Sequence, residues 1–221
     1  ASKLSIPNEY DKLMAAIGAD GTNAYTSFDV TCYIEDIPAN QLENWAKIQA
    51  DRFKHNVIRG FHTELETVYE EKNMSLTRDS RKLTEAMFSA LFKNHPYGTQ
   101  TVLGTQEHLK NPSITNIKNY YKQWYVPNNM AICMSGDFDF DEAMDIIEKY
   151  FGDMRPNPEL QMMSFEPEAE ITEPIVKEVW GLESERVALA WRFPGAASDE
   201  ALMLSIISSI MSNGQAGLID L

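Results

Sequence analysis

The chain has 221 residues and carries 33 acidic against 19 basic side chains, a formal net charge of −14. This balance argues against a nucleic-acid or anionic-membrane surface, because phosphate binding is built from clustered Lys and Arg. No run approaches eighteen apolar residues, so no segment is expected to span a bilayer. Two cysteines, Cys32 and Cys133, are too few for a disulfide framework, and both fall in expected strands as buried free thiols.

Seven segments show apolar residues at the three-to-four spacing of amphipathic helices. The helices are expected over residues 7–16, 42–56, 61–77, 83–91, 114–124, 140–151 and 201–211. The last of them is almost wholly apolar, which predicts burial on most sides. His95-Pro96-Tyr97-Gly98 lies between two of these helices and is expected to form a turn or loop.

One segment, Asn23 to Ile34, alternates apolar and polar residues over twelve positions, which predicts a strand of a sheet with one solvated face. Further strands are expected at 130–135, 175–180 and 187–193. Long strands mixed with helix pairs predict an α+β fold, with a mixed or antiparallel sheet and helices packed on one face. If the first strand lies at a sheet edge, its free backbone groups could pair with an extended peptide. A central strand would have no free groups, and the periodicity does not separate the two cases.

The densest chemical signal is the helical segment from Glu64 to Glu71, which holds four carboxylates and no basic residue. Glu64 and Glu71 stand seven apart, so they share one helix face at about 10 Å from each other. Glu66 and Glu70 stand four apart, which is repulsive by a few tenths of a kcal/mol on an isolated helix. A bound cation is one reason for such a stripe. The other is that Thr63-x-x-Glu66 forms a capping box at the helix start, and composition leaves both open.

The histidines do not have the spacing of a zinc-binding helix. Among His55, His62, His95 and His108 there is no pair three or four residues apart, as two imidazoles need in order to reach one ion from one face. We therefore do not expect the chain to assemble a zinc site from its own histidines. The sequence also has no phosphate-cradling Gly pattern, nucleophile elbow or CxxC motif.

Four groups of motifs lie in order along the chain, from Gly18 to about Gly152. They are Gly18–Ser27, Glu64–Glu71, His95–Gly98 with Leu103–Thr105, and Tyr125–Met130 with Gly136-Asp137. Taken together, these segments resemble the pitrilysin/insulinase (inverzincin) family of zinc metallopeptidases, which includes mitochondrial processing peptidases. The resemblance implies a pitrilysin/processing-peptidase-like half-domain.

The resemblance further implies an inverted zinc motif, His-x-x-Glu-His, on a helix upstream of this region. Its histidines would bind Zn²⁺ and its Glu would act as the base on a metal-bound water. By position, Glu71 is implied as the third protein ligand of the metal, and Glu64 as a catalytic carboxylate beside it. His95 is implied to be structural or peripheral. The strand residues implied to bind the peptide substrate by edge pairing are Asn23, Ala24, Tyr25 and Thr26.

The His-x-x-Glu-His motif is absent from these 221 residues. We therefore expect an internal fragment of a zinc metalloendopeptidase that is inactive and lacks Zn²⁺ by itself. Residues 1–155 would be part of the catalytic half-domain, 156–171 a proline-punctuated linker, and 172–221 the start of a second, homologous half-domain. Its partners would be the remaining domains of the parent chain and a peptide or unfolded polypeptide. The alternative is a non-catalytic family member that acts as a binding or assembly subunit.

Overall fold

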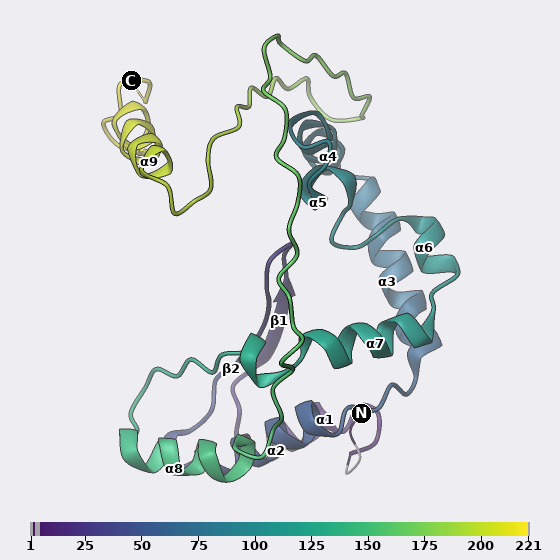
Figure 1. The fold of residues 1–221 in the computed structure, drawn as a ribbon, viewed down its shortest axis with the longest axis vertical. Helices are drawn as coiled ribbons and strands as arrows, with labels where there is room; N and C mark the ends of the chain where they lie inside the picture. The colour runs from purple at the N-terminus through teal and green to yellow at the C-terminus, as the bar shows by residue number, and fades with distance from the viewer. Residues whose placement is uncertain (1, 3–4, 221) are drawn as a thin grey trace. The chain divides into compact units, whose positions relative to one another are not determined.

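The computed structural model describes residues 2 and 5–220. The chain divides into two compact units. Figure 1 shows the helices and strands, coloured from the N-terminus to the C-terminus. The first unit is formed by residues 1–77 with 100–166, and the second by residues 78–99 with 167–221. The α+β class is confirmed, because the chain is rich in helices and carries a small antiparallel sheet.

The seven expected helices lie close to where the sequence periodicity predicts them, while α6 (Gln106–Lys110) was not expected. Several begin at a side-chain cap, because Ser113, Asp139 and Ser198 each accept a hydrogen bond from the backbone N–H three residues later. Pro96 opens a short helix where a loop was expected. The helices are α1 Tyr10–Ala16, α2 Leu42–Lys54, α3 Phe61–Leu76, α4 Asp79–Leu91, α5 Pro96–Thr99, α6 Gln106–Lys110, α7 Ile114–Trp124, α8 Phe140–Phe151 and α9 Asp199–Met211, with 3₁₀ turns at Ala39–Gln41 and Pro127–Asn129.

The single strand expected from residue 23 to residue 34 is wrong, since this segment forms a β-hairpin. Strands β1 (Thr22–Thr26) and β2 (Thr31–Glu35) pair in antiparallel fashion. In the turn between them, Ser27 N donates to Val30 O at 2.8 Å, and Ser27 Oγ accepts from Asp29 N at 3.4 Å. Ser and Asp are residues that favour turns through such local hydrogen bonds, and here they reverse the chain.

The hairpin also changes which side chains share a face. Ala24 is directly opposite Tyr33, and Tyr25 is directly opposite Cys32. Opposite residues of an antiparallel pair project to the same side, so odd-numbered residues of β2 share a face with even-numbered residues of β1. In a single strand the alternation would place Ala24 and Cys32 on one apolar face, whereas in the hairpin these two residues lie on opposite faces.

The other expected strands and the expected burial of the last helix are also not found. Within the described residues, segments 130–135, 175–180 and 187–193 join no ladder, and Cys133 is exposed rather than buried in a strand. Val187 and Trp191 are 90% and 70% exposed, and α9 is exposed along most of its length, with Ile206 at 50%. Apolar segments of this kind need partner elements to bury their side chains, and the two units leave these faces open.

The first unit is organised around α2, which packs against α1 and α8. The buried side chains of these helices are small or flexible, namely Met14, Ala46, Ala50 and Ala143. At the edges of the contact, Lys149 and Tyr150 donate hydrogen bonds to Glu43, and Lys54 is paired with Asp153. Every helix in the described ranges is too short or too polar to cross a bilayer.

Candidate functional site

Both predicted site carboxylates lie on α3. The helix begins after Gly60, which has a φ of +66°, a left-handed conformation that suits glycine. Gly60 occupies the cap position and no side chain caps the helix, so the capping box predicted at Thr63 is wrong. Thr63 lies within the first turn, and its carbonyl accepts a hydrogen bond from the Thr67 hydroxyl at 3.3 Å. The acidic stripe therefore does not owe its presence to a capping box.

Glu64 and Glu71 are both exposed, whereas Leu65 and Tyr69 are half-buried and Lys72 is only 4% exposed. The two carboxylates therefore project from the outer side of α3 and are open to another part of a larger protein or to a ligand. No group of three His, Cys, Asp or Glu side chains suited to a metal ion occurs among the residues that the structure describes. One carboxylate supplies one of the four ligands of a zinc centre, so the described residues do not fit a complete zinc site by themselves.

The orientation of α3 depends on α6, which packs against it. Gln106 Nε2 donates to Asn73 Oδ1 at 2.7 Å, two residues beyond Glu71. The Leu103–Thr105 motif produces α6, because Gly104 adopts a φ of +72° and Thr105 then caps the helix. The motif thus fixes the surface against which α3 is held. Neither Asn73 nor Gln106 has a signal in the sequence that would indicate this role.

The predicted peptide-binding residues Asn23 to Thr26 all lie on β1 and are exposed. Because Ser27 N bonds to Val30 O, the alternation of the antiparallel ladder directs the N–H of Ala24 away from β2. That N–H donates to the Asn23 side-chain oxygen at 2.8 Å. The outer side of β1 is therefore an edge whose backbone donor is held by a neighbouring side chain, which an incoming strand could replace.

Behind the hairpin, Arg52 of α2 lies among aromatic rings. Its guanidinium carbon is 4.5 Å from the centroid of the Tyr10 ring and 4.3 Å from that of Tyr33. The Tyr33 and Tyr125 hydroxyl oxygens are 3.2 Å apart. Burial raises the pKa of Tyr33, and it raises the pKa of Tyr10 to about 12. These phenols stay protonated near neutral pH, so the cluster holds β2 against α2 and offers no general base.

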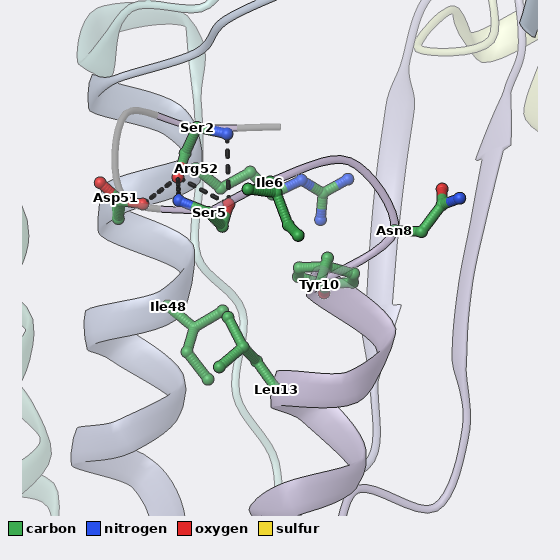
Figure 2. A pocket seen from close by; sticks show the side chains of 9 residues that line it. All are labelled: Ser2, Ser5, Ile6, Asn8, Tyr10, Leu13, Ile48, Asp51 and Arg52. Atoms are coloured by element: carbon green, nitrogen blue, oxygen red, sulfur yellow. Dashed lines mark hydrogen bonds between the residues drawn. The ribbon is translucent and has the colours of Figure 1, made fainter. Parts of the chain in front are cut away.

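A small cavity of about 80 Å³ adjoins this cluster (Figure 2). Leu13 and Ile48 form its apolar wall, and Asp51 lies at its polar end. The Asp51 carboxylate accepts a hydrogen bond from the Ser2 hydroxyl and lies 3.0 Å from His55 Nδ1. Asp51 therefore joins Ser2 to α2, an arrangement that fastens residues near the start of the chain to this helix. Nothing in the sequence pattern indicated this cavity.

Comparisons with known proteins agree with the motifs. Residues 113–219 match the family described as "Peptidase M16 inactive domain". An uncharacterised zinc protease of Mycobacterium leprae is 27% identical over 139 residues, which is 62% of this chain and 31% of the relative. Core protein I of the ubiquinol-cytochrome-c reductase complex of Euglena gracilis is 24% identical over 201 residues, 86% of this chain and 38% of that protein.

The fold has a counterpart among solved structures. The first half of the periplasmic protease PqqL from Escherichia coli matches with a TM-score of 0.68 and 20% identity, over 76% of this chain and 38% of that one. The chain spans about a third of the length of the first curated relatives that it matches, and less of some others. The motifs, the sequence relatives and the shared fold point to the same group of proteins. The chain is therefore similar to the M16 peptidase family, the pitrilysin-like group that its motifs indicate.

Proposed function

We propose that the protein to which this chain belongs is a zinc metalloendopeptidase, and that this chain supplies Glu71 as the carboxylate ligand of the metal. The observation that carries the proposal is the pair of exposed carboxylates, Glu64 and Glu71, on the open side of one helix. Like-charged side chains gain nothing from sharing an exposed helix face, whereas a carboxylate is a normal zinc ligand. Relatives named as zinc proteases support the same assignment.

In this proposal Glu64 assists catalysis from beside the ligands, and the remaining ligands come from other parts of the parent protein. The 221-residue chain alone would then bind zinc weakly and cleave no peptide, because one carboxylate does not hold the ion. The peptide or unfolded substrate would add to the outer edge of β1 along Asn23–Thr26, since that edge is exposed and unpaired by another strand in the described part. Residues 1–155 would be part of the catalytic half-domain without the zinc-motif helix, 156–171 a linker, and 172–221 the start of a second, homologous half-domain.

The test is Glu71→Gln in the longer parent protein, with bound zinc measured by elemental analysis and cleavage of an unfolded polypeptide measured in parallel. We expect zinc content to fall well below one ion per chain and cleavage to be lost. Glu66→Gln, which changes another exposed carboxylate of α3, is the matched control and should leave both unchanged. Stoichiometric zinc in the Glu71 variant would show that a different carboxylate is the ligand.

A second function has specific support, namely a non-catalytic subunit that binds or assembles with other proteins. The matching family is described as an inactive domain, and the relative that aligns with 86% of this chain is a core protein of a respiratory complex. Under this alternative the wild-type parent protein would hold no zinc and cleave no polypeptide. The same zinc analysis of the wild-type protein therefore separates the two functions.

A further inference from the structure

The His95–Gly98 motif, which the proposed site does not use, forms a tightly packed turn just after the end of α4. The Tyr97 ring lies 4.2 Å from the His95 ring and 5.5 Å from the Phe92 ring, measured between centroids. Tyr97 N donates to His95 Nδ1 at 3.2 Å. A Cβ on Gly98 would lie 1.8 Å from the carbonyl oxygen of Phe92, so only glycine fits there. The ring contacts, this hydrogen bond and the close approach at Gly98 thus hold the turn in one backbone conformation.

That conformation presents two successive backbone N–H groups to a carboxylate from a distant part of the chain. Glu168 Oε1 accepts hydrogen bonds from Asn94 N at 2.7 Å and from His95 N at 2.8 Å. Hydrogen bonds to an ionised acceptor are stronger than neutral ones. The bond from His95 N is the main cause that lowers the pKa of Glu168, so the acceptor is charged near neutral pH.

Arg192 holds the same end of α4 from a second position. Its Nη1 donates to the carbonyl oxygen of Leu91 at 2.5 Å, and its Nη2 donates to the carbonyl oxygen of Ala169. Its guanidinium carbon lies 6.0 Å from the centroid of the Phe92 ring. The arginine therefore joins the last turn of α4 to the residue that follows Glu168. We call Glu168, Arg192 and their partners the C-end clamp.

The beginning of α4 is held in a similar way. Asp79 Oδ2 accepts from Glu183 N at 2.6 Å, and Glu183 Oε1 accepts from Asp79 N at 3.4 Å. Lys82 Nζ donates to Asp79 Oδ1 at 3.1 Å and to the Trp180 carbonyl at 3.4 Å. A Cβ on Gly181 would lie 2.0 Å from the Asp79 carboxylate, so the loop approaches as closely as glycine allows. We call this set the N-end clamp.

We propose that residues 167–193 form a strap fastened to α4 by these two polar clamps, one at each end of the helix, and that the His95–Gly98 motif is the receptor for the C-end clamp. Between the clamps the strap is open to solvent, with Val176 81% exposed and Val187 90% exposed. The attachment is therefore carried by polar contacts at the helix ends and not by apolar burial along the strap. Because the clamps are separate, each should open without the other.

Hydrogen–deuterium exchange on the whole 221-residue chain tests the C-end clamp, because exchange reports local opening of individual amides. Glu168→Ala removes the acceptor of the Asn94 and His95 amides, and we expect both to exchange at least about tenfold faster. The matched control is Glu170→Ala, which changes an exposed carboxylate of the same strap and should leave those two amides unchanged.

The N-end clamp is tested by a pair of glycine substitutions. Gly181→Ala places a methyl group against the Asp79 carboxylate, so we expect faster exchange at the Glu183 and Asp79 amides. A Cβ on Gly195 meets nothing within 4 Å, so Gly195→Ala is the control for the loss of glycine itself. The Asn94 and His95 amides should keep their wild-type rates in both glycine variants.

Two results would contradict the proposal that residues 167–193 are held to α4 by two separate clamps. Unchanged exchange at Asn94 and His95 in the Glu168→Ala variant would mean that the carboxylate does not hold them. Equal acceleration in α2 and α8, which lie in the first unit, would mean that the substitution unfolds the chain as a whole and that no separate clamp exists. Arg192→Met removes the two guanidinium donors without changing the Glu168 acceptor. Its exchange rates at the C-end clamp, compared with those in α2 and α8, should then distinguish local opening from unfolding of the whole chain.

Discussion

Arg52 shows how one side chain organises the contact between the hairpin and α2. Its guanidinium lies over the Tyr10 and Tyr33 rings and within 3.8 Å of the Glu35 carboxylate, whose side chain is 8% exposed. A cation over aromatic rings is stabilising, and a desolvated carboxylate needs a nearby positive charge or hydrogen-bond donors. Arg52 supplies the charge, while the Tyr10 hydroxyl and Gln49 supply donors.

We expect Arg52→Met to lower the free energy of unfolding by about 2 kcal/mol, because the variant keeps the apolar stem but loses the cation over the rings. Urea denaturation followed by tryptophan fluorescence measures the change. Arg155→Met is the control, because Arg155 is exposed in an irregular segment, and its effect should be below about 0.5 kcal/mol. Equal midpoints for the two variants would show that the rings pack equally well without the cation.

For single residues, the sequence predicts the positions of side chains that belong to a motif. It does not predict side chains whose role depends on a contact with a distant part of the chain. Glu64 and Glu71 are found on one exposed helix face, as their spacing predicts. The bond between Asn73 and Gln106, and the clamp formed by Glu168, join residues that are 33 and at least 73 positions apart. Single polar residues of this kind have no periodicity, so nothing in one sequence distinguishes them from other exposed side chains.

Among the elements, the seven expected helices were predictable because each carries its own hydrogen bonds and its own run of apolar side chains, whereas the short helices α5 and α6 were not predicted. The hairpin was not, because its turn interrupts neither the alternation of residue types nor the run of β-forming side chains. The signal that could have found it is Ser27-x-Asp29, a pair of turn-favouring residues in the middle of the run. The strands expected at 175–180 and 187–193 needed partner strands, which sequence periodicity does not supply.

The exposed edge of β1 leads to a prediction about peptide binding by the longer parent protein. Ala24→Pro removes the backbone N–H that faces away from β2, while the ladder to β2 keeps its donors. We expect affinity for an extended peptide to fall about tenfold, because strand addition depends on such main-chain hydrogen bonds. Ala24→Val keeps the N–H and is the control. Undiminished affinity in the proline variant, with the hairpin intact by hydrogen exchange, would place the peptide elsewhere.

The contact between α2 and α8 leads to a prediction about pH. The hydrogen bond from Lys149 lowers the pKa of Glu43, and that from Lys54 lowers the pKa of Asp153, below ordinary values of 4.5 and 3.8. A carboxyl whose pKa is lower in the folded chain stabilises the fold above its ordinary pKa, and this stabilisation is lost as the pH falls through the lowered value. The contact should therefore weaken on acidification below about pH 5.

Glu43→Gln isolates this effect. We expect the variant to have a lower urea midpoint than the wild-type chain at pH 6.5, and the difference to shrink as the pH is lowered to 3, because protonation of the wild-type carboxyl removes its charge. Both carboxyls are exposed, so added salt should reduce the difference at pH 6.5. Glu66→Gln on α3 should show no such pattern, and a difference that persists at pH 3 would contradict the electrostatic explanation.

For the molecule as a whole, charge and exposed apolar surface act in opposite directions. The net charge of −14 keeps copies apart, while Val187, Trp191 and the face of α9 with Ile206 offer apolar surface to any neighbour. The apolar character of these segments is evident from the sequence. Whether their side chains are buried depends on which other elements pack against them. Which surfaces stay open could therefore not be read from the chain alone.

We expect the 221-residue chain to associate as its carboxylates are protonated, because repulsion then falls while the apolar surface is unchanged. Light scattering at pH 7 and at about pH 4.5 measures this, at a protein concentration where the chain is dispersed at pH 7. Trp191→Glu should reduce the scattering at pH 4.5, whereas Glu66→Gln should not. Equal scattering by all three chains at pH 4.5 would show that the exposed strap does not drive association.

Cys32, which lies opposite Tyr25 in the hairpin, is a natural position for a fluorescent label. A thiol-reactive dye on Cys32 would stand on the face opposite to Tyr33 and the rings around Arg52, and so would leave that contact undisturbed. With Cys133→Ser to remove the other thiol, the label would respond to whatever covers the outer face of the sheet, and its emission would follow docking in real time.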